Sequence, residues 1–265
     1  MDRPKSILGA ASLPGTLFLR VALFLLVIGA FPVAAGAAPS AGASSLRVAE
    51  AAALETRTNG KIFGTDPVEG RYTCSGTALS TPSRSVVLTA GHCVMENRRW
   101  GRRIVFVPAY DHGTRPFGTF VASAVYTTKQ WRRTENPDFD VAALRVKPNR
   151  LGTLGDVVGD REWMTGRSRF SSFQIFGYPA GALQGEALRA CDTRGLGSDP
   201  LTNGLGGPPT IPGICDMAGG SSGGAWLVDG RYVDGVTSYG YTRQHTRLYS
   251  PYFGPAIGRF LASLP

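Results

Sequence analysis

Short apolar segments separated by turn-forming residues dominate the chain from residue 62 onward. Segments rich in β-branched and aromatic residues lie at 72–79, 85–89, 103–108, 119–126, 141–146, 172–178, 225–228 and 232–239. Turn formers such as the Asp-Gly pair at 229–230 separate them, and no helical periodicity intervenes. This order predicts an all-β fold of antiparallel strands and argues against alternating strands and helices.

One late segment has a helical pattern instead. Within residues 254–264, apolar side chains recur at helical spacing, which predicts a short C-terminal helix. Residues 147–165 lack strong strand character, and we expect them to separate two strand-rich halves.

The first residues have the pattern of an export signal. Arg3 and Lys5 precede an apolar run at 21–33, and small residues at 35–37 and 41–43 fit cleavage sites. We expect a signal peptide over 1–37, with cleavage as late as 43, and a leader or propeptide-like segment over 38–60. The uncharged run is short for a membrane span, so we expect a secreted protein without membrane association; a retained anchor is the alternative.

Composition and charge exclude several classes of protein. The 265 residues include 35 Gly and 18 Pro, a content of turn formers that is high for a helical bundle. The hydrophobic fraction, 43%, is too high for a disordered chain. The net charge is +9, and it falls to +7 without residues 1–37. The basic residues are scattered and form no known module, so we expect no nucleic-acid partner.

Four cysteines in an exported chain predict two disulfides, for which three pairings exist. Their spacing fits no zinc pattern, and we expect no metal and no cofactor. Pairing of neighbours, Cys74 with Cys93 and Cys191 with Cys215, is the simplest arrangement.

Three segments carry residue types suited to nucleophilic catalysis. His92 follows an apolar strand, Asp140 begins another, and Ser222 lies in the Gly-Ser-Ser-Gly-Gly segment 220–224. A serine hydroxyl needs a base to take its proton, an imidazole suits that task, and a carboxylate orients the imidazole. Glycines let backbone N–H groups converge on a developing oxyanion.

These segments resemble those of the chymotrypsin-fold serine peptidases, over residue 62 to the C-terminus. Residues 74–79 and 88–93 resemble the first disulfide and the catalytic histidine segment, and 140–144 and 220–224 resemble the aspartate and nucleophile segments. Segments 106–110 and 177–179 resemble the secreted bacterial trypsin-like and V8-like members.

The resemblance implies two six-stranded antiparallel barrels, about 61–150 and 165–265, with the site between them. It implies a triad of His92, Asp140 and Ser222, with the N–H groups of Gly220 and Ser222 as oxyanion donors. We expect a monomeric serine endopeptidase that acts on polypeptides through an acyl-enzyme.

The strand that pairs with the substrate backbone is implied at Ser238, Tyr239 and Gly240. Asp216 is six residues before Ser222, at the position that forms the base of the first specificity pocket in this family. In trypsin-like members an Asp there selects Arg or Lys. The alternative is that Asp216 faces solvent or a helix end. Thr237 stands where glutamyl-specific relatives carry His, which disfavours that alternative specificity.

For the acid and the nucleophile, a neighbouring residue is an alternative assignment. Asp138 competes with Asp140, but only Asp140 is followed by Val-Ala, and Ser221 competes with Ser222, which has two glycines directly after it. The other histidines, at 112 and 245, lie in polar turn-like segments, where we expect them to be solvated.

Two rival functions are weighed against this interpretation. An α/β-hydrolase would use Ser222 with Asp234 and His245, but the short gaps leave no room for the intervening strands and helices. A non-catalytic binding protein on the peptidase scaffold is the other rival, although all three triad residue types are present.

The chain departs from zymogen-activated relatives at Ser221. Those relatives carry an Asp there, which pairs with a new N-terminal ammonium. The Lys-Ile-Phe-Gly segment 61–64 superficially resembles their cleavage site, so cleavage near Lys61 is expected to remove at most a leader. The loop closed by Cys191 and Cys215 is the candidate for ordering the oxyanion loop instead.

Overall fold

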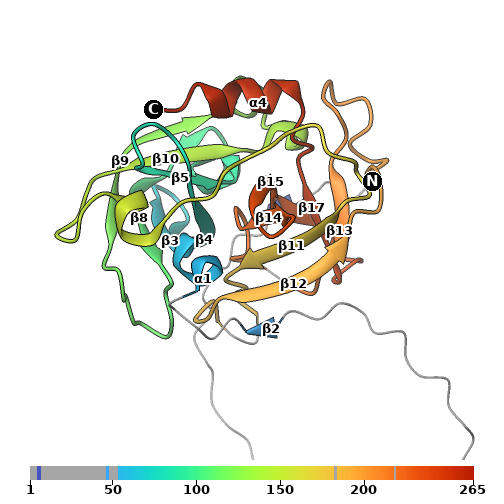
Figure 1. The fold of residues 1–265 in the computed structure, drawn as a ribbon. Coiled ribbons are helices and arrows are strands. Elements are labelled where there is room, and N and C mark those ends of the chain that lie inside the picture. The colour runs from blue at the N-terminus through green and yellow to red at the C-terminus, as the bar shows by residue number, and fades with distance from the viewer. Residues whose placement is uncertain (1–4, 7–45, 48–52, 182–183, 218) are drawn as a thin grey trace, which may run out of the picture.

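The structure, a computed structural model, describes residues 5–6, 46–47, 53–181, 184–217 and 219–265 (Figure 1). The expected signal cleavage sites at 35–37 and 41–43 lie outside these residues. Within the described part, no helix is long and apolar enough to cross a membrane.

The first half of the fold is a closed antiparallel barrel of six strands. Its order is β10-β5-β4-β3-β8-β9. The bounds are β3 (Asn59–Asp66), β4 (Gly70–Leu79), β5 (Val86–Thr89), β8 (Arg102–Pro108), β9 (Phe120–Thr127) and β10 (Ala142–Val146). The apolar residues of these short segments fill the barrel, with Ile62, Val87, Phe106 and Leu144 fully buried.

The second half contains two antiparallel sheets. One has the order β15-β14-β11-β12-β2 and the other β1-β16-β17-β13. The bounds are β1 (Lys5–Ser6), β2 (Leu46–Arg47), β11 (Ser172–Gly177), β12 (Arg189–Arg194), β13 (Ile211–Ile214), β14 (Ala225–Val228), β15 (Tyr232–Val236), β16 (Tyr239–Gly240) and β17 (Arg247–Ser250). An isolated bridge between Gly195 and Gly213 joins the sheets where a fully closed barrel would have a longer ladder.

Short helices and one hairpin connect and cover the strands. They are α1 (Leu54–Thr58), η1 (Gly91–Cys93), β6 (Met95–Glu96), β7 (Arg99–Trp100), α2 (Lys129–Thr134), η2 (Pro137–Phe139), α3 (Leu154–Val158) and α4 (Pro255–Ala262). The C-terminal helix expected within 254–264 is confirmed as α4, whose Ile257 and Leu261 are buried. In Figure 1, α4 lies across one end of the molecule, over both halves.

One hydrophobic cluster spans both halves. It includes Leu79 and Val86 from the first barrel and Phe176, Ala225 and Ile257 from the second half. The two halves therefore share a core, and the loops at their junction are held by packing on both sides.

Lys61 lies inside the first barrel and not in an exposed processing loop. It sits in β3, paired with Ser75 of β4 on one side and Val107 of β8 on the other, and only 3% of it is exposed. This placement argues against cleavage near Lys61, because a backbone hydrogen-bonded to strands on both sides is inaccessible to a protease. Folded structure also precedes it, since α1 leads directly into β3.

Candidate active site

His92 is fixed at the end of a buried strand. The chain leaves β5 and turns through η1, where Cys93 forms a disulfide with Cys74 of β4. Gly91 precedes the histidine, and a Cβ there would lie 2.8 Å from Oδ1 of Asp140 and 2.6 Å from the ring of Trp131. Only glycine therefore lets the histidine segment approach the aspartate this closely.

Asp140 contacts His92 twice. Its Oδ1 accepts a hydrogen bond from the backbone N–H of His92 at 2.8 Å, and its Oδ2 lies 2.7 Å from Nδ1 of the ring. Asp138, the competing carboxylate, is also buried, but it packs against Gly207. The structure thus brings Asp140 to the imidazole and directs Asp138 elsewhere.

The surroundings of His92 favour its protonated form. Burial lowers the pKa of the imidazole, but the charge and hydrogen bond of Asp140, together with the charge of Glu96, outweigh burial and raise the pKa above its ordinary value. The remaining ring nitrogen, Nε2, is buried and has no hydrogen-bond partner among the described residues. It is the atom that a general base would use.

Ser222 lies on a tight loop pressed against the first barrel. Its carbonyl oxygen accepts a hydrogen bond from the N–H of Ser75 at 2.7 Å and lies 3.6 Å from Sγ of Cys93, the neighbour of His92. Gly220 and Gly223 have φ values of +92° and +79°, which side chains rarely adopt. The glycines that flank the serine are thus required by backbone conformation and by close approach.

Ser75 is a residue of this site that the sequence analysis did not single out. Its Oγ donates to the carbonyl of Gly220 at 2.8 Å and accepts from the N–H of Tyr178 at 2.9 Å. One first-barrel side chain therefore holds two loops of the second half. Its only signal in the sequence is its place beside Cys74 in the segment 74–79.

The strand expected to bind substrate follows directly on from β15. Ser238 donates from its Oγ to Oδ2 of Asp140 at 2.5 Å. The hydroxyl of Tyr239 donates to Asp199 at 2.7 Å, and its ring stacks on Tyr249 with 4.8 Å between centroids. On its other edge β16 pairs antiparallel with β1, so this edge accepts an added strand.

Asp216, the residue predicted to set specificity, is not buried as His92, Asp140 and Ser222 are. Asp216 is exposed and directly follows Cys215, which is bonded to Cys191 as expected for neighbouring cysteines. A buried carboxylate that contacts Tyr239 is Asp199, which also accepts from Tyr241 at 2.7 Å. The sequence analysis missed Asp199 because no motif surrounds it.

The residues of the alternative interpretations are not assembled. His112 and His245 are exposed, and Asp234 is buried within β15. The α/β-hydrolase interpretation is wrong for the described residues, because their named strands pair antiparallel and form no parallel sheet.

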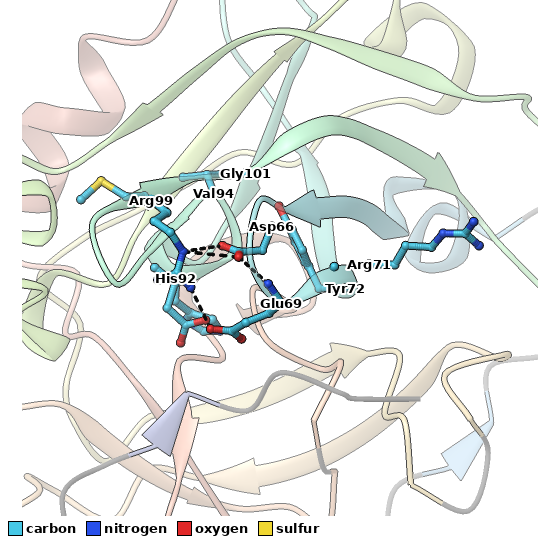
Figure 2. A pocket seen from close by; sticks show the side chains of 11 residues that line it. Asp66, Glu69, Arg71, Tyr72, His92, Val94, Arg99 and Gly101 are labelled. Atoms are coloured by element: carbon cyan, nitrogen blue, oxygen red, sulfur yellow. Dashed lines mark hydrogen bonds and ion pairs between the residues drawn. The ribbon is translucent and has the colours of Figure 1, made fainter. Parts of the chain in front are cut away.

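A polar pocket adjoins His92 on the side of the first barrel (Figure 2). It lies between the β3–β4 turn and the β6–β7 hairpin, where Arg99 pairs with Asp66 at 3.3 Å and with Glu69 at 2.8 Å. Arg71 points away from this cluster in Figure 2. Glu96 also lines the pocket, and burial raises the pKa of its carboxyl to about 7.

Two solved structures resemble the chain closely in fold. The protease Anisep from Arthrobacter nicotinovorans is 34% identical with a TM-score of 0.72, over 77% of this chain and 93% of that one. The thermostable serine protease AL20 from an extremophilic microorganism is 28% identical with a TM-score of 0.73, over 79% of this chain and 97% of that one.

A curated relative matches over a shorter stretch. The extracellular metalloprotease of Bacillus subtilis (strain 168) is 28% identical over 105 residues, which are 39% of this chain and 30% of that protein. In the part of the chain that the structure describes, the one group of three potential metal ligands is Cys74, His92 and Cys93. Its two sulfurs form a disulfide and offer no thiolate, so these residues do not fit a metal centre.

A sequence model of the Trypsin family matches residues 50–254, well over half of the chain. The matched range includes the first barrel, the disulfide-bonded cysteines and the loop of Ser222. With this match and these structural neighbours, the chain belongs to the trypsin family of chymotrypsin-fold serine peptidases.

Proposed function

We propose that this chain is a secreted serine endopeptidase that cleaves peptide bonds through an acyl-enzyme, with His92, Asp140 and Ser222 as its triad. The observation that carries the proposal is the double contact of Asp140 with His92, beside a loop that holds Ser222 against the same barrel. Family membership supports the peptidase class, and the residue roles are our assignment.

In the first step, Nε2 of His92 takes the proton of the Ser222 hydroxyl as its Oγ attacks the scissile carbonyl carbon. Asp140 holds Nδ1, so that Nε2 is the nitrogen left to accept a proton, and it stabilises the imidazolium that forms. The imidazolium then protonates the leaving amine, which departs and leaves an ester on Ser222. Water, deprotonated by His92, then attacks the ester carbonyl. The bond to Oγ of Ser222 breaks, the peptide leaves as its carboxylic acid, and the imidazolium returns its proton to Ser222.

The N–H groups of Gly220 and Ser222 are the proposed donors to the oxyanion. The left-handed backbone of Gly220 and the hydrogen bond that fixes its carbonyl to Ser75 support this role, because they set the orientation of the loop. Preorganised donors of this kind contribute roughly 10²–10³-fold to kcat.

The substrate backbone is proposed to pair with Tyr239 and Gly240. The antiparallel pairing of β16 with β1 supports this role, because an extended segment pairs with this edge there, and in the protein without residues 1–37 a substrate backbone is proposed to take its place. Ser238 connects this strand to Asp140, so binding and catalysis share one element.

A preference for Arg or Lys before the cut bond requires Asp216 to face the bound side chain. Its exposure beside Cys215 favours a solvent-facing role over a buried pocket base. Thr237 accepts a hydrogen bond from Nε1 of Trp226 at 3.0 Å and is buried, so it offers no imidazole for a glutamate.

Secretion is proposed from the signal-like first residues and from the curated relative that is named extracellular. It is tested by expressing the full chain and determining whether the protein in the medium begins after residue 37 or 43.

The function is tested by a cleavage-site profile. The secreted protein and its His92→Ala variant are incubated with a denatured protein mixture, and new termini are identified by mass spectrometry. Cuts that are absent with the variant support the peptidase, and an Asp216→Asn arm shows whether cuts after Arg or Lys depend on that carboxylate. An absence of cuts by the processed protein would contradict the proposal and favour the non-catalytic binding protein.

A further inference from the structure

A buried lysine lies at the junction between the two halves. Lys61 is in β3 of the first barrel, its side chain is 4% exposed, and its Nζ lies 3.0 Å from Oε1 of Glu186. The ammonium also lies 4.6 Å from the ring centroid of Tyr110. Burying a cation is unfavourable unless it is paired, so this side chain has a defined partner and position.

Glu186 belongs to the β11–β12 loop, residues 178–188, of which 182–183 lie outside the described part. Its Oε2 accepts a hydrogen bond from the hydroxyl of Tyr110 at 2.6 Å, and its carbonyl accepts from the N–H of His112 at 2.8 Å. The far end of this loop is thus anchored on the first barrel, by Lys61 and by two residues that follow β8.

The near end of the same loop contacts the loop of the nucleophile. The N–H of Ala180 donates to the carbonyl of Gly219 at 2.5 Å. A Cβ added to Gly220 would lie 2.5 Å from the carbonyl oxygen of Tyr178, so the two backbones are in direct contact. A hydrogen bond from the N–H of Gly185 to the carbonyl of Pro179, at 2.9 Å, joins the two ends of the β11–β12 loop.

The ammonium reaches this closed loop directly. A Cβ added to Gly185 would lie 3.3 Å from Nζ of Lys61 and 3.4 Å from the carbonyl oxygen of Tyr178. A continuous path of contacts therefore runs from Lys61 through Glu186 and Gly185 to the loop of Gly220.

We propose that Lys61 is a positioning residue whose ammonium, paired with Glu186, holds the β11–β12 loop against Gly219 and Gly220 and so keeps the oxyanion donors in place. This inference rests on the proposed function. Zymogen-activated relatives order this loop with the ammonium of a new N-terminus, which pairs with an Asp at the position of Ser221. This chain has no carboxylate at that position, and Lys61 supplies an internal cation instead.

The contacts of Glu186 favour its carboxylate form. Burial alone would raise the pKa of Glu186, but the hydrogen bonds from Tyr110 and Lys61 hold the pKa of this carboxyl below its ordinary value. A neutral side chain of similar length at position 61 would fill the same space but leave the carboxylate without its cation.

The test compares Lys61→Met and Glu186→Gln with the matched control Arg231→Met. The control removes an exposed ion pair with Glu162, at 2.9 Å. The first readout is the second-order rate of reaction with a fluorophosphonate, which needs the nucleophile, the base and the oxyanion donors. We expect each pair variant to react about 10–100-fold more slowly, with the control unchanged.

Three further measurements separate positioning from a merely structural role. The melting temperature must stay well above the assay temperature, and on a peptide substrate found in the cleavage-site profile the loss must appear in kcat with KM nearly unchanged. The double variant must lose no more than either single variant, since both act through one contact. Rates within twofold of wild type in folded variants, or additive losses, would overturn the proposal.

Hydrogen exchange makes the outcome independent of activity. In Lys61→Met, backbone amides of residues 178–188 and 219–222 should exchange faster, while those of β3 and β4 keep their protection. If the wild-type protein fails to react with the fluorophosphonate, the proposed function fails, and the exchange result still decides whether Lys61 orders this loop. Unchanged exchange at 219–222 would contradict the inference even in an active enzyme.

Discussion

The hydroxyl of Ser238 donates to Oδ2 of Asp140 at 2.5 Å, on the same carboxylate oxygen that lies 2.7 Å from Nδ1 of His92. Because Ser238 comes from the second half and Asp140 from the first, the carboxylate that we propose as the acid of the triad is oriented from both halves. A carboxylate held in this way keeps one imidazole tautomer in place during proton transfer.

Replacing Asp140 with Asn should therefore lower kcat by about 10⁴-fold while the protein remains folded, because the amide can favour the wrong tautomer of His92. The matched control is Asp138→Asn, two residues away, which packs against Gly207 and not against the imidazole. Steady-state kinetics on both variants, with circular dichroism to check folding, decide the point. Equal losses in both would contradict the assignment of Asp140.

Ser222→Ala should abolish turnover and fluorophosphonate labelling, because no other group supplies the nucleophile. Ser221→Ala is its neighbouring control, and we expect it to keep its reactivity within about tenfold, since Ser221 is not assigned to the chemistry. Intact-mass measurement after labelling shows which variant carries the probe. A labelled Ser222→Ala protein would show that the nucleophile was misassigned.

Glu96→Gln should extend activity to lower pH. The charge of Glu96 helps to raise the pKa of His92, and catalysis needs the neutral imidazole. Because burial raises the pKa of Glu96 itself to about 7, it carries only part of its charge where His92 titrates. We therefore expect the acidic limb of kcat/KM to shift downward by about 0.2–0.5 pH unit.

The control for that shift is Glu69→Gln, an exposed carboxylate that pairs with Arg99 in the same pocket. Its profile should coincide with that of the wild type. A shift to higher pH in Glu96→Gln would mean that Glu96 does not stabilise the imidazolium.

Asp234→Asn should stabilise the protein at alkaline pH. Asp234 is buried in β15, its Oδ1 has no hydrogen-bond partner among the described residues, and burial raises its pKa to about 7 against a partial opposing effect of Arg167. The folded state thus binds this proton more tightly than the unfolded state, so the stability it contributes is present below about pH 4 and is lost as the pH rises through 7.

At pH 8 the variant should gain up to about 4 kcal/mol, seen as a melting temperature higher by up to roughly 8–16 °C, with little change at pH 4. Asp229→Asn, whose carboxylate is exposed, serves as control and should change little at either pH. A gain of equal size at both pH values would show that ionisation of Asp234 is not the cause.

The strand pattern predicted the all-β fold and the C-terminal helix, since each depends on local sequence. The resemblance of short motif segments singled out His92 and Asp140, whose side chains lie in contact. The pairing of strands is not local. The chain leaves the sheet of β15 at Val236 and enters β16 at Tyr239, and this crossing, which divides the second half into two sheets, has no periodic signal.

The contacts that the sequence did not predict are those between distant residues. Lys61 looked like a processing site because its neighbours in sequence suggested one, yet its partner Glu186 is 125 residues away. Asp216 was selected by its offset from Ser222, whereas the carboxylate buried beside Tyr239 is Asp199, at a separation of 40 residues. Burial and pairing of a charge depend on such tertiary neighbours, which no short motif encodes.

The two hydrogen bonds from Ser75 to the carbonyls of Ser222 and Gly220 bear on when the site forms during folding. A strand of the first barrel forms part of the support of the nucleophile loop, so a chain in which only one half has folded has no assembled site. We therefore expect the proposed peptidase activity to appear only when both halves have folded. For the exported peptidase that we propose, copies that are still folding would therefore be unable to cleave one another.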